Sequence, residues 1–340
     1  MSIHKALVLE TKQGQQVVKD VPTPIPKSVE VLIRVESAAL NPVDHAIAHD
    51  GIFVENFPTV LGIDGAGVIE AVGDSVERYR PGDRVFFKSD IGDPSSSTFQ
   101  QKVIVPADLI GKIPDNWSFD EAATLPLATL TAAVGLFDVL KVPFPKDGTT
   151  SSEAGWILVT GGSGSVGQLT IQLAKLSGLK VITTSSPHNF PLLKSLGADI
   201  TIDRSSPSYV DQIRSHTNDT LTHAFDASGK EAILAARSLS SSAPSKLVLV
   251  LPPPNELVDL RKEKIFENVT ILAGGYDEHQ RPLAARVWRL LEGLVGQGKV
   301  KPNQVKVLEG GLAGVLEGQK LQREGKVSGF KYVVRPQDTK

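Results

Sequence analysis

The sequence predicts an α/β fold in which a doubly wound parallel sheet follows a β-rich part. From Trp156 onward, strand-length apolar runs alternate with helix-length runs, a pattern typical of a parallel sheet with helices on both faces. Residues 1–120 instead contain short apolar runs separated by Pro, Gly and Asp, as in a β-rich region. A glycine-rich turn lies between the first strand and the first helix of the alternating part.

The β-rich part is expected to begin with the first residues of the chain. Pro22, Pro24 and Pro26 space out an extended connection, because proline fixes φ and cannot donate to a sheet. The pattern becomes helical over 119–140, with a break at Pro126, and a loop is predicted over 143–155. The strands expected here are Ala6–Leu9, Val29–Val35, Ala66–Val72, Arg84–Phe87 and Gln101–Val105.

The glycine-rich turn has the context that a Rossmann dinucleotide-binding unit requires. The strand Trp156–Thr160 leads into Gly162-x-Gly164-x-x-Gly167, and a helix over 165–176 follows. In order, these glycines allow the tight turn, let the backbone approach a pyrophosphate and let the helix pack close to the strand. The pyrophosphate would then meet unpaired N–H groups at the helix N-terminus.

Gly178 ends this first helix, and the alternation continues to residue 296. A helix followed by a strand is expected over 311–334. The later strands expected are Lys180–Thr184, Ile200–Asp203, His223–Asp226, Lys246–Leu251 and Val269–Gly274. The later helices expected are Phe190–Leu196, Ser208–His216, Lys230–Ser238 and Leu283–Gly296.

The end of the second strand of the unit predicts which dinucleotide binds. NAD-preferring folds place an Asp or Glu about 20 residues past the glycine turn, where it holds the ribose 2′-OH. Residues 184–189 read Thr-Ser-Ser-Pro-His-Asn, with no carboxylate to repel a 2′-phosphate. We therefore expect NADPH rather than NADH, the alternative being that these residues only form a polar turn. The groups that could surround the phosphate are Ser185, Ser186, His188, Asn189 and Arg204.

Composition excludes several classes of protein. A chain of 340 residues is long enough for two domains. The formal net charge of −2 gives no argument for nucleic acid or a membrane surface. No uninterrupted apolar run has the length of a membrane span, and the N-terminus lacks a secretion core, so we expect a cytoplasmic protein. Because there is no cysteine, disulfides, thiol catalysis and thiolate–zinc sites are excluded.

Four segments carry a resemblance to a known family. They are Leu61-Gly-Ile-Asp-Gly-Ala-Gly-Val-Ile-Glu-Ala-Val-Gly73, Arg80-Pro-Gly-Asp-Arg-Val85, Glu121-Ala-Ala-Thr-Leu-Pro126 and Ser328-Gly-Phe-Lys331. With the glycine turn, they make the chain resemble the medium-chain dehydrogenase/reductase superfamily over nearly its whole length. The resemblance implies a GroES-like β-barrel domain over 1–125 and 277–340, completed by the C-terminal tail, and a Rossmann NADP-binding domain over 126–276.

Two places in the sequence indicate the branch of that superfamily. Where zinc alcohol dehydrogenases carry a cysteine and a His-Glu pair, this chain has Asn41-Pro-Val-Asp44 and Ile63-Asp64. It therefore resembles the zinc-independent quinone and enoyl reductases. The string Thr184-Ser-Ser-Pro-His-Asn-Phe190 is similar to fungal trans-acting enoyl reductases that serve polyketide synthases. Those enzymes usually follow the Asn-Pro-x-Asp motif with an aromatic residue and a lysine, whereas here His45 and Ala46 follow it.

The resemblance also implies roles for particular residues. Asn41 and Thr131 would lie near the nicotinamide. The resemblance names no proton donor, and His45 and Tyr276 are the candidates for that role. The residues implied at the cofactor, beyond the 2′-phosphate group above, are Gly162, Ser163, Gly164, Ser165, Val166, Gly167, Leu251, Pro252, Gly329 and Lys331. Leu251 and Pro252 are expected at the end of a strand, where parallel sheets bind ligands.

A metal site is an alternative to these roles. His45 and His49, flanked by Asp44 and Asp50, would share a face of a helix, and two imidazoles with a carboxylate can bind zinc. A polar, partly exposed barrel segment explains them equally well, and the family's ligand positions hold other residues. We therefore expect no metal.

The expected function is NADPH-dependent, zinc-independent hydride transfer to an activated C=C bond of a small substrate, an enoyl or enone compound. A trans-acting enoyl reductase of secondary metabolism would also meet an acyl carrier protein. The alternatives are a quinone oxidoreductase, then a carbonyl reductase or alcohol dehydrogenase, and, in a different class, a non-catalytic NADPH-binding protein. Neither nucleic acid nor membrane is expected as a partner, and monomer and homodimer both stay open.

Overall fold

The computed structural model describes residues 2–145, 155–263 and 265–340. The chain forms two compact units: the first comprises Met1–Leu127 and Gly274–Lys340, and the second Ala128–Ala273. Most of the loop predicted over 143–155 lies outside the described residues.

The second unit is built on a six-stranded sheet in the order β11-β10-β9-β12-β13-β14. Every neighbouring pair is parallel, as the alternation of strands and helices predicts. The chain starts in the middle of the sheet, moves to one edge, and then returns to build the other half. The strands are β9 Trp156–Thr160, β10 Lys180–Ser185, β11 Ile200–Asp203, β12 His223–Asp226, β13 Ser245–Leu249 and β14 Phe266–Thr270.

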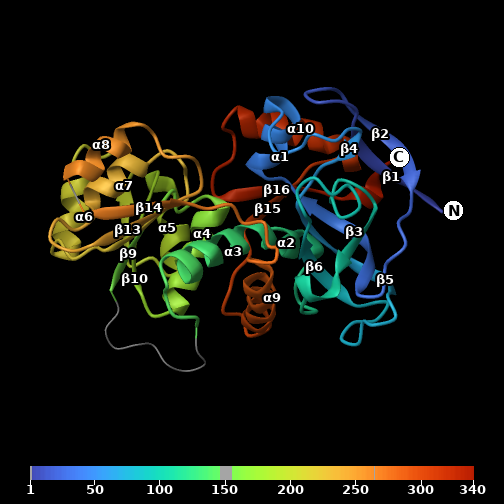
Figure 1. Ribbon diagram of the computed structural model, residues 1–340, viewed down its shortest axis with the longest axis horizontal. Coiled ribbons are helices and arrows are strands. Elements are labelled where there is room, and N and C mark those ends of the chain that lie inside the picture. The colour runs from blue at the N-terminus through green and yellow to red at the C-terminus, as the bar shows by residue number, and fades with distance from the viewer. Residues whose placement is uncertain (1, 146–154, 264) are drawn as a thin grey trace. The chain divides into compact units, whose positions relative to one another are not determined.

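Helices cover both faces of this sheet. Right-handed crossovers place α4 and α5 on one face and α6, α7 and α8 on the other, and Figure 1 shows the last three grouped together. The core under that group includes Leu158, Ile182 and Tyr209. The helices are α3 Pro126–Ala133, which opens the unit, α4 Ser165–Leu176, α5 Phe190–Ser195, α6 Tyr209–Thr217, α7 Ala232–Ser238 and α8 Glu256–Glu263.

Two strand predictions in this unit were wrong in their limits. β13 ends at Leu249 rather than Leu251, and β14 covers Phe266–Thr270 rather than 269–274. The two errors have one cause, because β14 pairs with β13 and the ladder closes at Leu249 and Thr270. Beyond Leu249 the chain turns through Pro252, Pro253 and Pro254, so the apolar run after Thr270 has no strand to pair with.

The first unit is β-rich. Its larger sheet runs β15-β16-β3-β5-β6-β8 with β7 paired to β3, and a three-stranded sheet runs β2-β1-β4. The C-terminal strand β16 pairs antiparallel with β3, so the tail completes the N-terminal sheet as predicted. The strands are β1 Ile3–Leu9, β2 Gln16–Pro22, β3 Glu30–Ala39, β4 Thr59–Val60, β5 Asp64–Val72, β6 Arg84–Lys88, β7 Lys102–Pro106, β8 Ile110–Lys112, β15 Gln304–Val307 and β16 Phe330–Val334.

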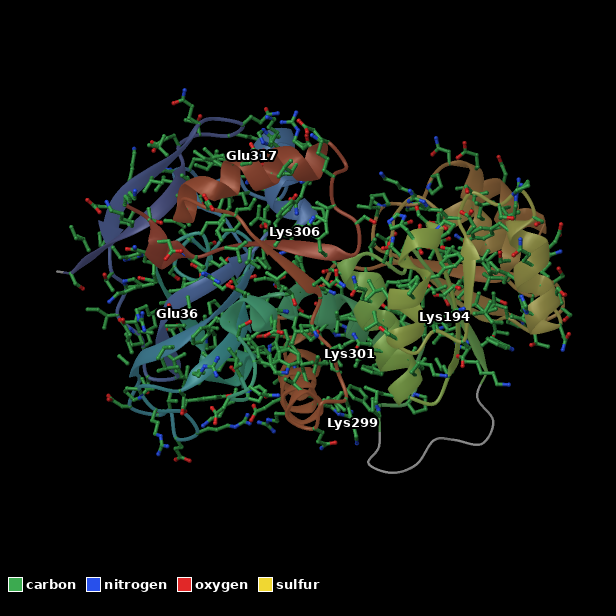
Figure 2. All side chains as sticks on the ribbon, turned by 180° about the vertical axis from the view of Figure 1, so that it is seen from behind. Glu36, Lys194, Lys299, Lys301, Lys306 and Glu317 are labelled. Atoms are coloured by element: carbon green, nitrogen blue, oxygen red, sulfur yellow. The ribbon has the colours of Figure 1, made fainter. Side chains whose placement is uncertain are left out.

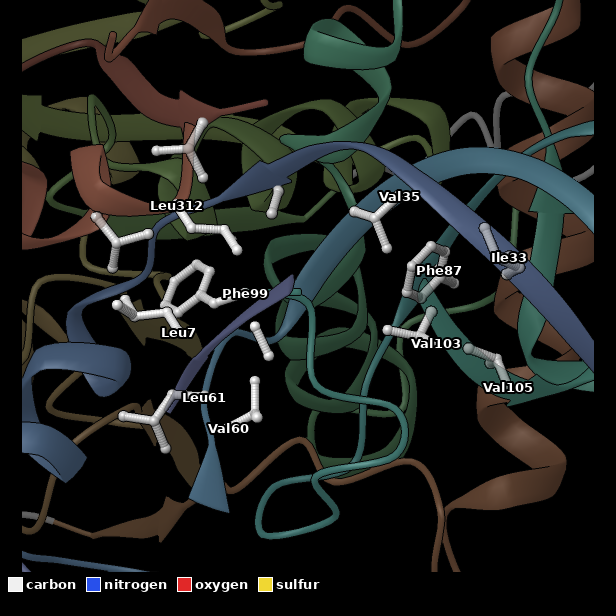
Figure 3. Packing of buried hydrophobic residues seen from close by; sticks show 14 of the residues in the cluster. Leu7, Ile33, Val35, Val60, Leu61, Phe87, Phe99, Val103, Val105 and Leu312 are labelled. Carbon is white, nitrogen blue, oxygen red and sulfur yellow. The ribbon is translucent and has the colours of Figure 1, made fainter. Parts of the chain in front are cut away.

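The core of this unit is contributed by strands far apart in the sequence. Figure 3 shows Leu7 of β1, Val35 of β3 and Phe87 of β6 directed into one apolar interior, together with Phe99 and Leu312. All five side chains are buried. By contrast, charged side chains such as Lys306 and Glu317 lie at the surface of the unit (Figure 2).

The sequence interpretation left several elements of this unit unassigned. β2, β4 and β15 are short or largely exposed strands, which lack the apolar alternation of a buried one. The segment 42–50, for which a helix and a polar barrel segment were both open, is a helix. The helices are α1 Pro42–Asp50, α2 Phe119–Ala123, α9 Arg281–Gly296 and α10 Gly314–Arg323.

The apolar helical run of 119–139 is a core element. By length and composition it could cross a membrane, but 78% of its apolar window is buried inside the protein. The expected break at Pro126 is present, because α2 ends at Ala123 and α3 begins at Pro126.

Candidate functional site: a glycine-rich turn and a buried ionic cluster

The glycine-rich turn between β9 and α4 needs glycine at two of its three positions for space. A Cβ on Gly162 would lie 2.0 Å from Thr183 Oγ1, and one on Gly167 would lie 2.5 Å from the carbonyl oxygen of Gly161. A Cβ on Gly164 would meet nothing nearer than 3.4 Å. Gly162 and Gly167 therefore serve close packing, whereas Gly164 keeps open the face that a pyrophosphate would approach.

Backbone hydrogen bonds hold this turn in place. The Gly162 N–H donates to Thr184 O at 2.9 Å, and the Gly164 N–H donates to Gly161 O at 3.0 Å. The hydrogen bonds of α4 begin with Gln168 N–H donating to Gly164 O. Helix N–H groups before that point have no intrahelical acceptor, and they attract anions. The turn thus fits a dinucleotide pyrophosphate.

The other residues implied at the pyrophosphate lie in the same turn. Ser163 uses its carbonyl oxygen to accept from Gln168 Nε2 at 2.9 Å, and Ser165 and Val166 form the start of α4. The structure therefore brings together the residues that are predicted to bind the pyrophosphate, and their contact with a cofactor stays a prediction.

The residues predicted around a 2′-phosphate gather where β10 and β11 end. Ser185 is buried and its hydroxyl donates to Ser186 O at 3.0 Å. The Arg204 N–H donates to Ser185 O at 3.1 Å, which places an exposed arginine beside the serine pair. His188 is exposed and Asn189 is buried in the short turn that follows.

A carboxylate also lies at this end of the sheet, and sequence reasoning missed it. Glu231 Oε2 accepts hydrogen bonds from Thr184 Oγ1 at 2.8 Å and from the Tyr209 hydroxyl at 3.2 Å. Glu231 follows β12, far along the chain from β10. The signal available in the sequence was its place in the segment between a predicted strand and the next helix, because parallel strands end at a common edge.

Burial raises the pKa of Glu231 above its usual range. Hydrogen bonds from Thr184 and Tyr209 oppose that rise, as does the positive charge of Arg204, while Asp226 adds to it. The carboxyl group is therefore held in place by two hydroxyl donors within a mostly buried setting.

In the first unit, three predicted or motif residues meet in a buried ionic cluster. Asp64, at the start of β5, forms an ion pair with Lys331 of β16, and it accepts from Asn41 Nδ2 at 3.0 Å. Its other oxygen accepts the Leu127 N–H at 2.6 Å. Asp64 is fully buried, and Asn41 and Lys331 are each 4% exposed. Lys331 is implied at the cofactor by the resemblance, and in the structure its ammonium group is paired with the Asp64 carboxylate.

Asp44 adds a second carboxyl group to the cluster. It is fully buried, and one of its oxygens accepts the Asn41 N–H at 2.7 Å. Burial raises the pKa of Asp44 to about 8; the Asn41 N–H and Lys331 oppose the rise, and Asp64 supports it. Asp44 is therefore protonated near neutral pH, so that the cluster balances one ammonium with one carboxylate.

This raised pKa predicts a pH-dependent stability that Asp44→Asn should remove. Between about pH 4 and 8 the folded protein holds a proton that the unfolded chain releases, so stability falls as pH rises, by about 1.4 kcal/mol per pH unit. Asparagine keeps the acceptor for the Asn41 N–H without a charge. We expect the variant's stability relative to the parent to increase from pH 5 to 8, measured by urea unfolding. A difference that stays constant with pH would contradict the assignment.

The helix α1 holds the two histidines of the metal alternative. It does place His45 and His49 one turn apart, but Asp44 points to the Asn41 N–H and His49 is exposed. His45 is half-buried, burial lowers its pKa, and its Nδ1 is buried without a hydrogen-bond partner. Over residues 2–145, 155–263 and 265–340, no three His, Asp or Glu side chains are grouped to hold a metal.

Tyr276 has its hydroxyl committed elsewhere. It donates to Lys88 O at 2.6 Å, and burial raises the pKa of the phenol well above its usual value. The Lys88 ammonium is itself buried, donating to Ser89 O and Gly274 O, and burial lowers its pKa to about 8. The Tyr276 hydroxyl proton is therefore engaged by the Lys88 carbonyl oxygen, which weakens the case for Tyr276 as a proton donor.

The remaining predicted site residues are spread over the two units. Leu251 lies two residues past the end of β13, 51% exposed, and packs over Gly229. Pro252 is exposed beside it. Gly329 precedes β16 with a φ of 77°, and Thr131 is buried in α3, in the unit that holds the glycine turn.

Comparison with known families agrees with both units. The alcohol dehydrogenase GroES-like domain family matches residues 27–115, and the zinc-binding dehydrogenase family matches residues 165–272. A solved structure of an alcohol dehydrogenase superfamily protein from Novosphingobium aromaticivorans has a TM-score of 0.84 at 23% identity and covers 98% of this chain and 99% of its own. That likeness shows the fold.

Curated relatives match over almost the whole chain. A zinc-type alcohol dehydrogenase-like protein of Schizosaccharomyces pombe is 33% identical over 97% of this chain and 99% of its own length. Trans-enoyl reductase ACTTS2 of Alternaria alternata is 32% identical over 98% and 99%. The enoyl reductase component lovC of the lovastatin nonaketide synthase of Aspergillus terreus is 30% identical over 92% and 91%. The chain is an oxidoreductase that belongs to the medium-chain dehydrogenase/reductase superfamily.

Proposed function

We propose that the protein is an NADPH-dependent reductase of activated carbon–carbon double bonds, acting on enoyl or enone substrates. The observation that carries the proposal is the glycine turn, open at Gly164, with Ser185, Ser186 and Arg204 gathered at the end of the neighbouring strand. The relatives named as enoyl reductases, which match nearly the whole chain, support the enoyl class.

The residues of this chain divide the work of such a reaction. Bound NADPH would supply the hydride, as nicotinamide cofactors do. The turn and the first turn of α4 bind the pyrophosphate. The family resemblance assigns Asn41, whose amide is held by Asp64, and Thr131 to the nicotinamide end. Hydrogen-bond donors stabilise the negative charge that develops on the substrate carbonyl oxygen, and the half-buried His45 is the candidate proton donor in place of the family's lysine.

Zinc chemistry does not fit the residues present. The chain has no cysteine, and Asn41 and Asp64 stand where zinc dehydrogenases carry ligands. Asp64 is already shared between Lys331, Asn41 and the Leu127 N–H. With the Lys331 ammonium beside it and three of its four lone-pair sites occupied, this carboxylate is a poor zinc ligand.

The partner that we propose is an acyl carrier protein that presents the enoyl thioester. One relative is named as a component of a polyketide-type synthase, and another as a trans-enoyl reductase. Figure 2 shows Lys299 and Lys301 in the segment that leads into β15, and Lys306 within β15; all three are exposed. This is the basic surface at which an acidic carrier would be sought.

A cytoplasmic location, and a monomer or homodimer, complete the proposal.

The experiment is NADPH oxidation by the purified protein with a short trans-2-enoyl thioester and a simple quinone side by side. Turnover of the thioester is expected. Turnover of the quinone alone would favour the quinone oxidoreductase alternative, which Ala46, in place of the family's lysine, supports. Binding of NADPH without turnover of either substrate would favour a non-catalytic NADPH-binding protein.

Arg204→Ala should separate the two dinucleotides. Loss of a guanidinium paired with a phosphate removes about 1.5–3 kcal/mol, so we expect the Kd for NADPH to rise about 10- to 100-fold and that for NADH to change little. Fluorescence titration measures both constants. Arg289→Ala, which removes an exposed arginine from α9 of the first unit, is the matched control. Equal losses for both dinucleotides would refute the assignment of Arg204 to the 2′-phosphate.

A further inference from the structure

A chain of hydrogen bonds runs beneath the glycine turn to a buried carboxylate. The Gly161 N–H donates to Thr184 Oγ1 at 3.2 Å, and Thr184 Oγ1 donates in turn to Glu231 Oε2 at 2.8 Å. Gly161 directly follows β9, Thr184 lies near the end of β10, and Glu231 is the N-cap residue of α7, in the segment after β12. A carboxylate at the start of α7 thereby reaches the backbone of the turn that follows β9.

Capping of the following helix, α7, does not account for the position of the Glu231 side chain. Glu231 is the N-cap residue of α7, but its side chain makes no capping hydrogen bond. Its N–H donates to Asp226 Oδ2 at 3.3 Å, so the backbone is held independently of the carboxylate. At 9% exposure, a carboxyl group is costly to bury unless it is hydrogen-bonded. Its purpose therefore lies in what it accepts from Thr184 and Tyr209.

Gly161 is the residue in the turn whose placement most needs such support. Its φ of 64° lies in the left-handed region, and its carbonyl oxygen accepts the Gly164 N–H. The position of Gly164, on the open face of the turn, therefore depends on Gly161. Thr184 accepts hydrogen bonds from two successive residues of the turn: its hydroxyl accepts the Gly161 N–H, and its carbonyl oxygen accepts the Gly162 N–H.

The Glu231 carboxylate fixes which way the Thr184 hydroxyl faces. A threonine hydroxyl has one proton and two lone pairs. When the proton goes to Glu231, a lone pair is left directed at the Gly161 N–H. Without that acceptor the hydroxyl can rotate its proton elsewhere, and the Gly161 N–H loses a preorganised partner.

We propose that Glu231 is a positioning residue for the dinucleotide, which it serves by orienting Thr184 and thereby the start of the glycine turn. The inference rests on the proposed use of NADPH. Because the turn holds the pyrophosphate common to both dinucleotides, Glu231 acts on NADPH and NADH alike. This distinguishes its role from that of Arg204, which concerns only the 2′-phosphate.

The test is dinucleotide binding to a set of variants, by fluorescence titration, with urea unfolding of each variant. Glu231→Leu and Thr184→Val are each expected to raise the Kd for NADPH and for NADH by about tenfold, the equivalent of one hydrogen bond. Glu231→Gln and Thr184→Ser retain the acceptor and the hydroxyl, and should bind within about threefold of the parent. The double variant Glu231→Leu/Thr184→Val should be no worse than either single one, since both break one chain.

Tyr209→Phe is the matched control. It removes the other donor to the same Glu231 oxygen and leaves the Thr184 contact intact. It should leave both binding constants unchanged even if it lowers stability. Parent-like binding by Thr184→Val, or a loss in Tyr209→Phe as large as that in Glu231→Leu, would overturn the inference. A parent protein that binds neither dinucleotide would overturn this inference and the proposed function together, whereas binding without turnover of any substrate would overturn only the proposed function.

Discussion

Replacing Lys331 with methionine is expected to destabilise the protein by about 3–5 kcal/mol, because it leaves a buried carboxylate without its countercharge. Asp64 is fully buried, and Lys331 is its charged partner at 4% exposure. Methionine has a similar length and fills most of the space, so loss of packing contributes little. The measurement is the free energy of unfolding from urea denaturation at pH 7.

The double variant Lys331→Met/Asp64→Asn isolates the charge. With both charges gone, no ion stays unpaired, and replacement of a whole buried pair is often close to neutral. We expect the double variant to recover most of the loss. Lys320→Met, on the exposed side of α10, is the matched control and should change stability by less than about 0.5 kcal/mol. A single variant as stable as the parent would show that the Lys331–Asp64 pair does not anchor the cluster around Asn41.

Gly164→Ala should weaken NADPH binding without loss of stability, whereas Gly167→Ala should lower stability as well, although both glycines belong to one motif. At Gly164 the new methyl group meets nothing within 3.4 Å, and the φ of −71° suits alanine. The variant should fold normally but bind NADPH at least about tenfold more weakly, because the methyl group covers the face that the pyrophosphate approaches.

At Gly167 the methyl group would lie 2.5 Å from Gly161 O and 2.7 Å from Gly162 Cα. These are backbone atoms that cannot swing aside, so overpacking should cost about 1–3 kcal/mol or more of stability as well as binding. Urea unfolding and NADPH titration measure the two effects separately. Gly293→Ala in α9, where nothing lies within 4 Å of the new methyl group, is the control. Normal NADPH binding by Gly164→Ala would contradict the placement of the pyrophosphate.

Local patterns predicted the second unit well. The helix over 165–176 and the strands Ile200–Asp203 and His223–Asp226 have the predicted limits, because glycine or polar residues bound each of them in the sequence. The prediction weakened where an element depends on its neighbour. β14 pairs only with β13 at the sheet edge, so its limits follow from where β13 stops. The exposed strands β2 and β15 gave no apolar alternation to detect.

For the candidate site, the sequence by itself determined the chemistry of the turn. Three glycines between a strand and a helix, and a strand end without a local carboxylate, are features of neighbouring residues. Spacing along the chain is enough to read them, since a turn is built from residues that follow one another.

Only the tertiary structure decided which charges meet. Asp64 and Lys331 are 267 positions apart, and Thr184 and Glu231 are 47 apart, yet each pair is in direct contact. Sheet pairing sets these contacts: β16 adds to β3 beside β5, and β10 and β12 flank β9. The sequence therefore did not reveal that Asp64 is the partner of Lys331, and it missed Glu231. The partner of a buried charge is chosen by the order of strands in a sheet, which no short stretch of sequence contains.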